Sequence, residues 1–154
     1  MAQKETVLDV RWRGELAFEA RNAQGGRTLM GRIGDEAGLG AMETLLASVA
    51  GCSGYDVVYI LQKKRKPITD VRIQIRGRRR DQHPKVYDRV HIVYHVYGDN
   101  LKAKDVEQAI RLSLEKYCSA SATLAAWAEI TFEYHVHPAA DAPADAPGRP
   151  SPSP

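Results

Sequence analysis

The two cysteines of this chain are the residues whose type and placement could do chemistry. Cys52 ends the segment 42–52, Met-Glu-Thr-Leu-Leu-Ala-Ser-Val-Ala-Gly-Cys, and Cys118 ends the segment 114–118, Leu-Glu-Lys-Tyr-Cys. A reactive thiolate and a second thiol that can close a disulfide on it make a peroxide-reducing pair. The alternative is that both are core residues, because free cysteine is among the most buried residue types. From the cysteines alone, both interpretations stay open.

The element that must position Cys52 is a long apolar helix. Apolar residues recur at steps of three and four over residues 42–63, which predicts a helix that is apolar over most of its circumference and buried on most sides. Gly51 and Gly54 flank Cys52 and weaken the helix, so we expect another backbone or a ligand to come close there. Pro67 ends the helical pattern.

The other segments alternate between strand and helix patterns, which predicts an α+β domain. In chain order they are strands at 6–12, 15–21 and 27–30, an irregular glycine-rich connection at 31–40, two long antiparallel strands at 68–76 and 87–97, helices at 102–117 and 119–126, and a last strand at 129–136. Cys118 lies between the two predicted later helices.

The composition sets the broad class of protein. The chain has 154 residues, which suits one domain over residues 1–137. Residues 138–154 are mostly Pro, Ala, Asp, Gly and Ser and predict a disordered tail. We find no apolar run near the roughly 20 residues that span a bilayer, so we expect no membrane partner. Two distant cysteines do not form a secreted disulfide framework, which favours a cytoplasmic location.

Two basic runs, 63–66 and 76–80, raise the question of nucleic acid, as does the net charge of +3. Acidic residues are interleaved with these runs, at Asp70, Asp81 and Asp88. No nucleic-acid-binding motif or aromatic platform accompanies them. We therefore do not expect a nucleic-acid partner.

The histidines do not predict a metal site. His91 and His95 share one face of a strand but stand roughly 13 Å apart along it. His135 and His137 lie closer together, at the end of the last strand. No Cys/His cluster has the spacing of a zinc site, so we expect no metal.

Two segments resemble the OsmC/Ohr family, named for osmotically inducible protein C and the organic hydroperoxide resistance protein. Residues 41–63 are similar to the family's central helix, and residues 115–119, Glu-Lys-Tyr-Cys-Ser, to its second cysteine segment. The resemblance covers residues 6–137 and is closest to the YhfA-like branch, through residues 56–63 and 112–118.

This resemblance implies an OsmC-like α+β fold, with antiparallel sheets wrapped around long central helices in an intertwined homodimer. It implies a thiol-dependent peroxidase that reduces organic hydroperoxides in oxidative stress defence. Cys52 would be the peroxidatic thiol and Cys118 the resolving thiol. An arginine of the first hairpin would activate Cys52, and Arg13 is preferred over Arg11 and Arg21. The reductant would be a small dithiol or a thiol protein, with no cofactor.

The chain departs from the family's hydroperoxide reductases at two motifs. It has Ala-Met at 41–42 where they have a Pro-Glu pair, and Ser119 where they have proline. Glu43 falls near the opposite side of the helix from Cys52, and we expect it to act as a favourable charge in the first helical turn. These departures leave an alternative: a non-catalytic small-ligand-binding or thiol redox-sensing protein on the same scaffold.

Overall fold

The computed structural model describes residues 5–149 of the chain. These residues divide into two compact units, one extending to Leu45 and the other beginning at Leu46. The boundary falls inside the long helix α1 (Ala41–Lys63), whose bounds agree with the helix that the sequence predicts.

The first unit is built on an antiparallel three-stranded sheet. Its strands, in spatial order, are β1 (Asp9–Gly14), β2 (Ala17–Arg21) and β3 (Arg27–Met30). Asn22 shapes the turn between β2 and β3, because its side-chain oxygen accepts from the amides of Gln24 and Gly26. A short hairpin follows, formed by β4 (Arg32–Ile33) and β5 (Glu36–Ala37), in the stretch predicted as irregular.

The second unit contains another three-stranded sheet, and one strand direction in it differs from the prediction. The strands are β6 (Asp70–Arg79), β7 (Tyr87–Tyr97) and β8 (Glu129–His137), with β7 in the centre. β6 and β7 are antiparallel, as predicted, but β8 runs parallel to β7, so the expectation of antiparallel sheets is wrong here. A helical crossover joins β7 to β8 and returns the chain to the end where β7 began, which makes the pair parallel.

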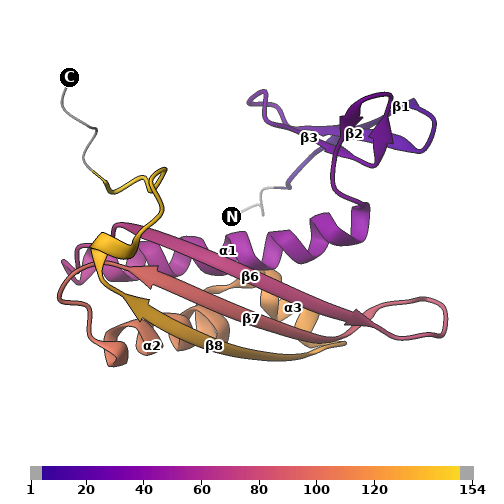
Figure 1. Cartoon of the computed structure of the whole chain (residues 1–154). Helices are drawn as coiled ribbons and strands as arrows, with labels where there is room; N and C mark the ends of the chain where they lie inside the picture. The colour runs from indigo at the N-terminus through magenta and orange to yellow at the C-terminus, as the bar shows by residue number, and fades with distance from the viewer. Residues whose placement is uncertain (1–4, 150–154) are drawn as a thin grey trace, which may run out of the picture. The chain divides into compact units, whose positions relative to one another are not determined.

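Helices cover one face of this sheet (Figure 1). After β7 come α2 (Ala103–Leu112), the π-helical turn η1 (Ser113–Tyr117) and α3 (Ser119–Ala125). The sequence predicts one regular helix over 102–117, whereas the last part of that stretch is η1. Tyr94 bonds to α1 and Tyr134 to α2 from the same side of the sheet, so both helices pack on this face.

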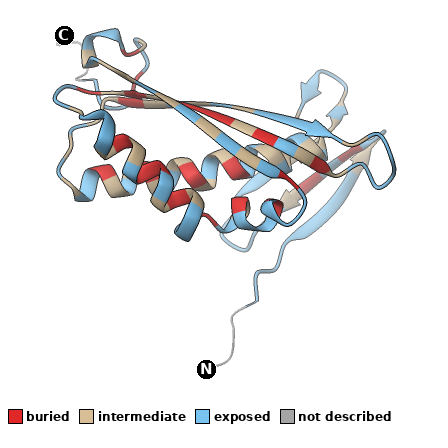
Figure 2. Ribbon diagram, turned by 90° about the horizontal axis from the view of Figure 1, so that it is seen from below, coloured by how far each residue is buried: buried red, intermediate tan, exposed pale blue. Residues whose placement is uncertain are grey.

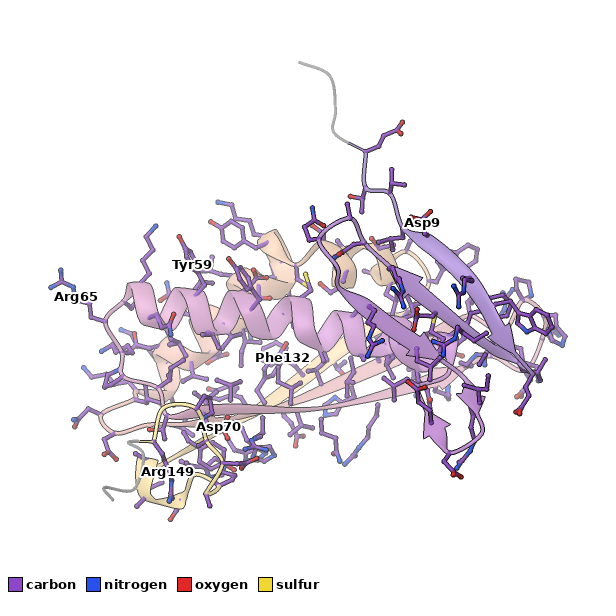
Figure 3. All side chains as sticks on the ribbon, turned by 90° about the horizontal axis from the view of Figure 1, so that it is seen from above. Asp9, Tyr59, Arg65, Asp70, Phe132 and Arg149 are labelled. Carbon is purple, nitrogen blue, oxygen red and sulfur yellow. The ribbon has the colours of Figure 1, made fainter. Side chains whose placement is uncertain are left out.

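The core lies between these helices and the inner face of the sheet (Figure 2). Its fully buried large side chains come from α1, β7 and α2: Val49, Val57, Leu61, Val90, Ile92, Tyr94, Val96, Val106 and Ile110. Only one stripe of α1 is buried. Tyr55 and Tyr59 on α1 are 71% and 53% exposed. The composition of the helix predicts burial on most sides, and within one chain this prediction is wrong. Figure 3 shows Tyr59 projecting from α1.

By length and hydropathy alone, α1 would also be able to cross a membrane, although the sequence predicts no membrane-spanning segment. It has 23 residues and a window of mean hydropathy 1.4. The central helix of a folded core passes the same test, and the stripe of α1 that holds Val49, Val57 and Leu61 is part of such a core.

The segment after β8 differs from the disordered tail that its composition predicts. It contains the short helix η2 (Ala139–Asp141), and it buries Ala142 and Ala146. The Gly148 amide donates to the Thr69 carbonyl at 2.9 Å, and Figure 3 shows Arg149 beside Asp70 at the start of β6. Backbone hydrogen bonds and small buried alanines thus hold residues 138–149, while residues 150–154 lie outside the described part of the chain.

Candidate functional site

Cys52 occupies the middle of α1, next to the buried stripe of that helix. A Cβ atom added to Gly54 would lie 2.9 Å from Cδ1 of Ile73 on β6, so a larger residue there would require the Ile73 side chain to shift. A Cβ at Gly51 would meet no atom of the described chain within 4 Å. Within the described chain, the close neighbour of these glycines is a side chain of β6 at Gly54, whereas the sequence predicts a backbone or a ligand.

Cys118 is the residue that joins η1 to α3, and it is buried. Its backbone is extended, with φ −73° and ψ 100°, which ends one helix and starts the next. Its sulfur accepts the amide N–H of Ser121 at 3.4 Å and so caps α3. Its thiol points to the carbonyl oxygen of Val49 on α1, with a long S···O separation of 4.0 Å.

The fold brings the two cysteines together as free thiols. Burial raises the pKa of the Cys118 thiol, and hydrogen bonds from Ser121 oppose this rise. The Cys52 side chain is close enough to act as a hydrogen-bond partner of Cys118, and it raises the pKa of Cys118 further. Two thiols from segments far apart in the sequence therefore lie side by side, and the raised pKa means that Cys118 keeps its proton to a higher pH than an ordinary cysteine.

Arg13, the arginine preferred on sequence grounds, lies on β1 in the other unit. Its guanidinium forms a 2.6 Å ion pair with Glu19, a carboxylate that is only 4% exposed. Arg21 binds the same carboxylate at 2.5 Å, whereas Arg11 is exposed. The hydrogen bond from Arg21 lowers the pKa of Glu19, and the charges of Arg21, Arg13 and Arg27 lower it further against the effect of burial.

Glu43 has the role that the sequence predicts for it, at the start of α1. Its carboxylate accepts the Gly40 amide N–H at 2.7 Å. The contact satisfies one of the free amides at the helix N-terminus and places a negative charge in the first turn.

A buried chain of hydroxyl groups beside the cysteines was missed at the sequence level. Tyr94 OH lies 2.6 Å from Ser53 Oγ, and Ser113 Oγ lies 2.9 Å from both Ser53 Oγ and Asp56 Oδ2. Burial raises the pKa of Tyr94 to about 12. The sequence does contain a sign of this cluster, because three polar residues interrupt the apolar faces of their elements: Ser53, Tyr94 and Ser113.

The histidines gather on the outer face of the second sheet, away from the cysteines. The ring of His95 stacks on those of His135 and His137 at centroid separations of 5.1 and 5.2 Å. Burial and then the two neighbouring rings lower the pKa of His95. Among residues 5–149, no three or more His, Cys, Asp or Glu side chains are grouped in a way that could hold a metal ion.

Comparison with known proteins identifies relatives over most of the chain. Residues 34–133 match the family model described as OsmC-like protein. Protein YhfA of Escherichia coli (strain K12) is 38% identical over 128 residues, which cover 82% of this chain and 95% of the relative.

Solved structures share the fold. A hypothetical protein from Aquifex aeolicus VF5 superimposes with a TM-score of 0.75 and 35% identity, covering 87% of this chain and 98% of that one. An organic hydroperoxide resistance protein OsmC from Legionella pneumophila superimposes with a TM-score of 0.64 and 13% identity, covering 88% and 100%. The family model and the 38% identity to YhfA lead to one conclusion. The chain belongs to the OsmC family.

Proposed function

We propose that the protein is a cysteine-dependent reductase of organic hydroperoxides. The observation that carries this proposal is the buried Cys118 thiol, which lies close enough to Cys52 for the two side chains to interact. A thiol this close can attack an oxidised neighbour without a long excursion of the backbone. The name of the Legionella relative, which refers to organic hydroperoxide resistance, supports the substrate class.

In the proposed reaction, the Cys52 thiolate attacks the terminal oxygen of the hydroperoxide. The S–O bond forms, the O–O bond breaks, and the departing alkoxide takes a proton and leaves as an alcohol. The Cys118 sulfur then attacks the Cys52 sulfenic acid, water leaves with the Cys118 proton, and a disulfide closes. An external dithiol reduces this disulfide in two thiol exchange steps and becomes oxidised itself.

Arg13 is proposed as the group that activates Cys52. A guanidinium stays charged at all physiological pH values and lowers the pKa of a nearby thiol, which makes the thiolate available. Its ion pair with the buried Glu19 fixes the orientation of its side chain within its own unit.

The proposal includes a homodimer, which the resemblance to the family implies. The exposed rings of Tyr55 and Tyr59 support it, because they stack with centroids 6.2 Å apart and present an apolar side of α1. Such a surface is typical of a protein interface.

A second candidate, a thiol redox sensor without turnover, is favoured by the start of α1. Met42 stands where the family's hydroperoxide reductases have their glutamate, and Glu43 is engaged in capping the helix. A sensor would form the same disulfide but would not turn over.

Consumption of cumene hydroperoxide with dithiothreitol as reductant tests these functions. We expect many turnovers per protein, and a complete loss in Cys52→Ser. Cys118→Ser should form the sulfenic acid, which dimedone traps, but no disulfide. Gln74→Ala on the outer face of the sheet is the matched control and should turn over like the unmodified protein. One peroxide consumed per chain, with a disulfide that dithiothreitol does not reduce, would favour the sensor, and no consumption at all would overturn the peroxidase.

A further inference from the structure

The buried hydroxyl chain contacts both segments that carry a cysteine. Ser53 follows Cys52 directly on α1, and Asp56 lies one helical turn further on. Ser113 begins η1, and its carbonyl oxygen accepts the amide N–H of Cys118 at 2.7 Å. Tyr94 adds the central strand of the sheet to the same cluster. Three elements therefore meet in one set of hydrogen bonds beside the two thiols.

The direction of these hydrogen bonds follows from the protons available. A carboxylate only accepts, so the Ser113 hydroxyl is the donor toward Asp56 Oδ2. The Ser113 hydroxyl is also the donor toward Ser53 Oγ at 2.9 Å, so its proton is shared between two acceptors, and either hydroxyl can donate in the contact between Ser53 and Tyr94. The hydrogen bonds run without a break from Tyr94 through the two serines to the Asp56 carboxylate. No buried side-chain nitrogen or oxygen in the described part of the chain lacks a partner.

A polar cluster in this place is not explained by stability alone. Ser53, Tyr94 and Ser113 are each fully buried, and burying a polar group is unfavourable unless it is hydrogen-bonded. Apolar side chains of similar shape would fill the same volume without that requirement. Hydrogen bonds differ from apolar contacts in being directional, so the cluster fixes how α1 is rotated and shifted relative to β7 and η1.

The π turn makes this register matter for Cys118. A π turn holds one residue more than an α-helical turn, and it closes here with the bond from Cys118 to Ser113. Without the extra residue, the side chain of Cys118 would rotate by about 100° around the helix axis. The position of Ser113 therefore decides whether the Cys118 sulfur faces α1.

We propose that Tyr94 and Ser113 are positioning residues that hold α1 and η1 in the register at which Cys52 and Cys118 can close a disulfide. This inference rests on the thiol pair of the proposed function, but it does not require that the oxidant be a peroxide. It concerns the geometry of closure, so any oxidant that accepts two electrons can reveal it.

The test is equilibrium closure of the disulfide with oxidised dithiothreitol, using the full-length protein. The reagent's S–S bond breaks, the Cys52–Cys118 bond forms, and two electrons and two protons pass to the reagent. Acid quenching and alkylation with N-ethylmaleimide followed by mass spectrometry give the ratio of disulfide to dithiol. We expect Tyr94→Phe and Ser113→Ala to lower the closure constant by roughly threefold to tenfold, the effect of one lost hydrogen bond.

Tyr134→Phe is the matched control. Its hydroxyl donates to Glu107 Oε2 at 3.2 Å, from the same face of the sheet but against α2. It should close as readily as the unmodified protein. Ser113→Thr retains the hydroxyl and should restore closure relative to Ser113→Ala. All variants are compared well below their melting temperatures. If Tyr94 or Ser113 only stabilised the fold, its substitution would lower Tm and leave the closure constant unchanged.

The outcomes separate this inference from the peroxidase proposal. Equal closure constants in Tyr94→Phe, Ser113→Ala and Tyr134→Phe would overturn the positioning role, even if the protein reduces cumene hydroperoxide. Failure of the unmodified protein to close any disulfide would also overturn it. Weakened closure in the two variants would support it, even in a protein that consumes no peroxide.

Discussion

The Cys118 amide donates to the Ser113 carbonyl oxygen at 2.7 Å, across the five-residue turn η1. Ser113 thereby bonds to one cysteine segment through its backbone, and its hydroxyl reaches Asp56 on the helix that carries the other cysteine. A single serine thus connects the surroundings of both thiols. The effect of the Ser113 hydroxyl on stability and the titration of the Cys118 thiol can be measured separately.

Ser113→Ala should lower the free energy of unfolding by about 1–3 kcal/mol, because it leaves buried partners without a hydrogen bond. Urea denaturation followed by circular dichroism measures this change. Ser119→Ala is the control, since Ser119 is exposed at the start of α3, and we expect it to stay within about 0.5 kcal/mol of the unmodified protein. Equal unfolding free energies for the two variants would contradict the role of the buried hydroxyl.

Cys52→Ala leaves Cys118 as the single thiol of the chain, so its titration can be followed by thiolate absorbance at about 240 nm. Burial is the main cause of the raised pKa of Cys118, and this cause remains in the variant. The midpoint should therefore stay above 9.0, the ordinary value for this thiol. A midpoint below that value would show that Cys118 is not held as a protonated thiol.

The sequence was sufficient to predict most elements of this fold. The apolar steps of three and four residues in α1 and the alternation in β6 and β7 extend over long elements, which makes these elements easy to predict. The parallel direction of β8 was not predicted, because the alternation of residues along a strand is the same whether the neighbouring strand is parallel or antiparallel.

The site was only partly predictable, for a similar reason. Two cysteine segments could be named from their residues, but the turn η1 that directs Cys118 has the same residue spacing as an ordinary helix end. The cluster around Tyr94 needs three elements to meet, and a serine on an apolar helix face does not reveal its partner on another element. Such contacts are set by packing rather than by local sequence.

Glu19→Gln should remove part of the acid sensitivity of folding. The hydrogen bond from Arg21 is the main cause that lowers the pKa of Glu19 below its ordinary value of 4.5. The unfolded chain then binds more protons than the folded one, so this stabilisation is complete above pH 4.5 and is lost as the pH falls through the lower folded value.

Urea midpoints of the full chain at a series of pH values measure the effect. The difference between the unmodified protein and Glu19→Gln should shrink as the pH is lowered below about 4.5. Other acidic groups titrate in both proteins and cancel in this difference. A difference that does not change with pH would contradict the charged contacts of Glu19.

Tyr55→Asp should weaken the proposed homodimer. Tyr55 is 71% exposed in the single chain and stacks on Tyr59, so a partner helix would cover both rings. Burying a carboxylate there without a cation is strongly unfavourable, and the dissociation constant should rise by at least about tenfold. Sedimentation velocity over a concentration series measures it. Gln74→Asp adds the same charge on the outer sheet face, and an equal shift there would argue against an interface on α1.

Ser119→Pro should be accepted by the fold, although it restores the proline of the family's hydroperoxide reductases. Ser119 is the first residue of α3, where the backbone N–H has no acceptor within the helix and where proline is favoured. Cys118 before it is already extended, as a residue preceding proline prefers. The free energy of unfolding should stay equal or rise by up to about 1 kcal/mol.

Ser121→Pro is the matched control: it removes the N–H that bonds to the Cys118 sulfur at 3.4 Å, and it should destabilise the protein clearly. If urea denaturation shows that both proline variants unfold equally early, the N–H of Ser119 has a structural role that this helix start does not assign to it.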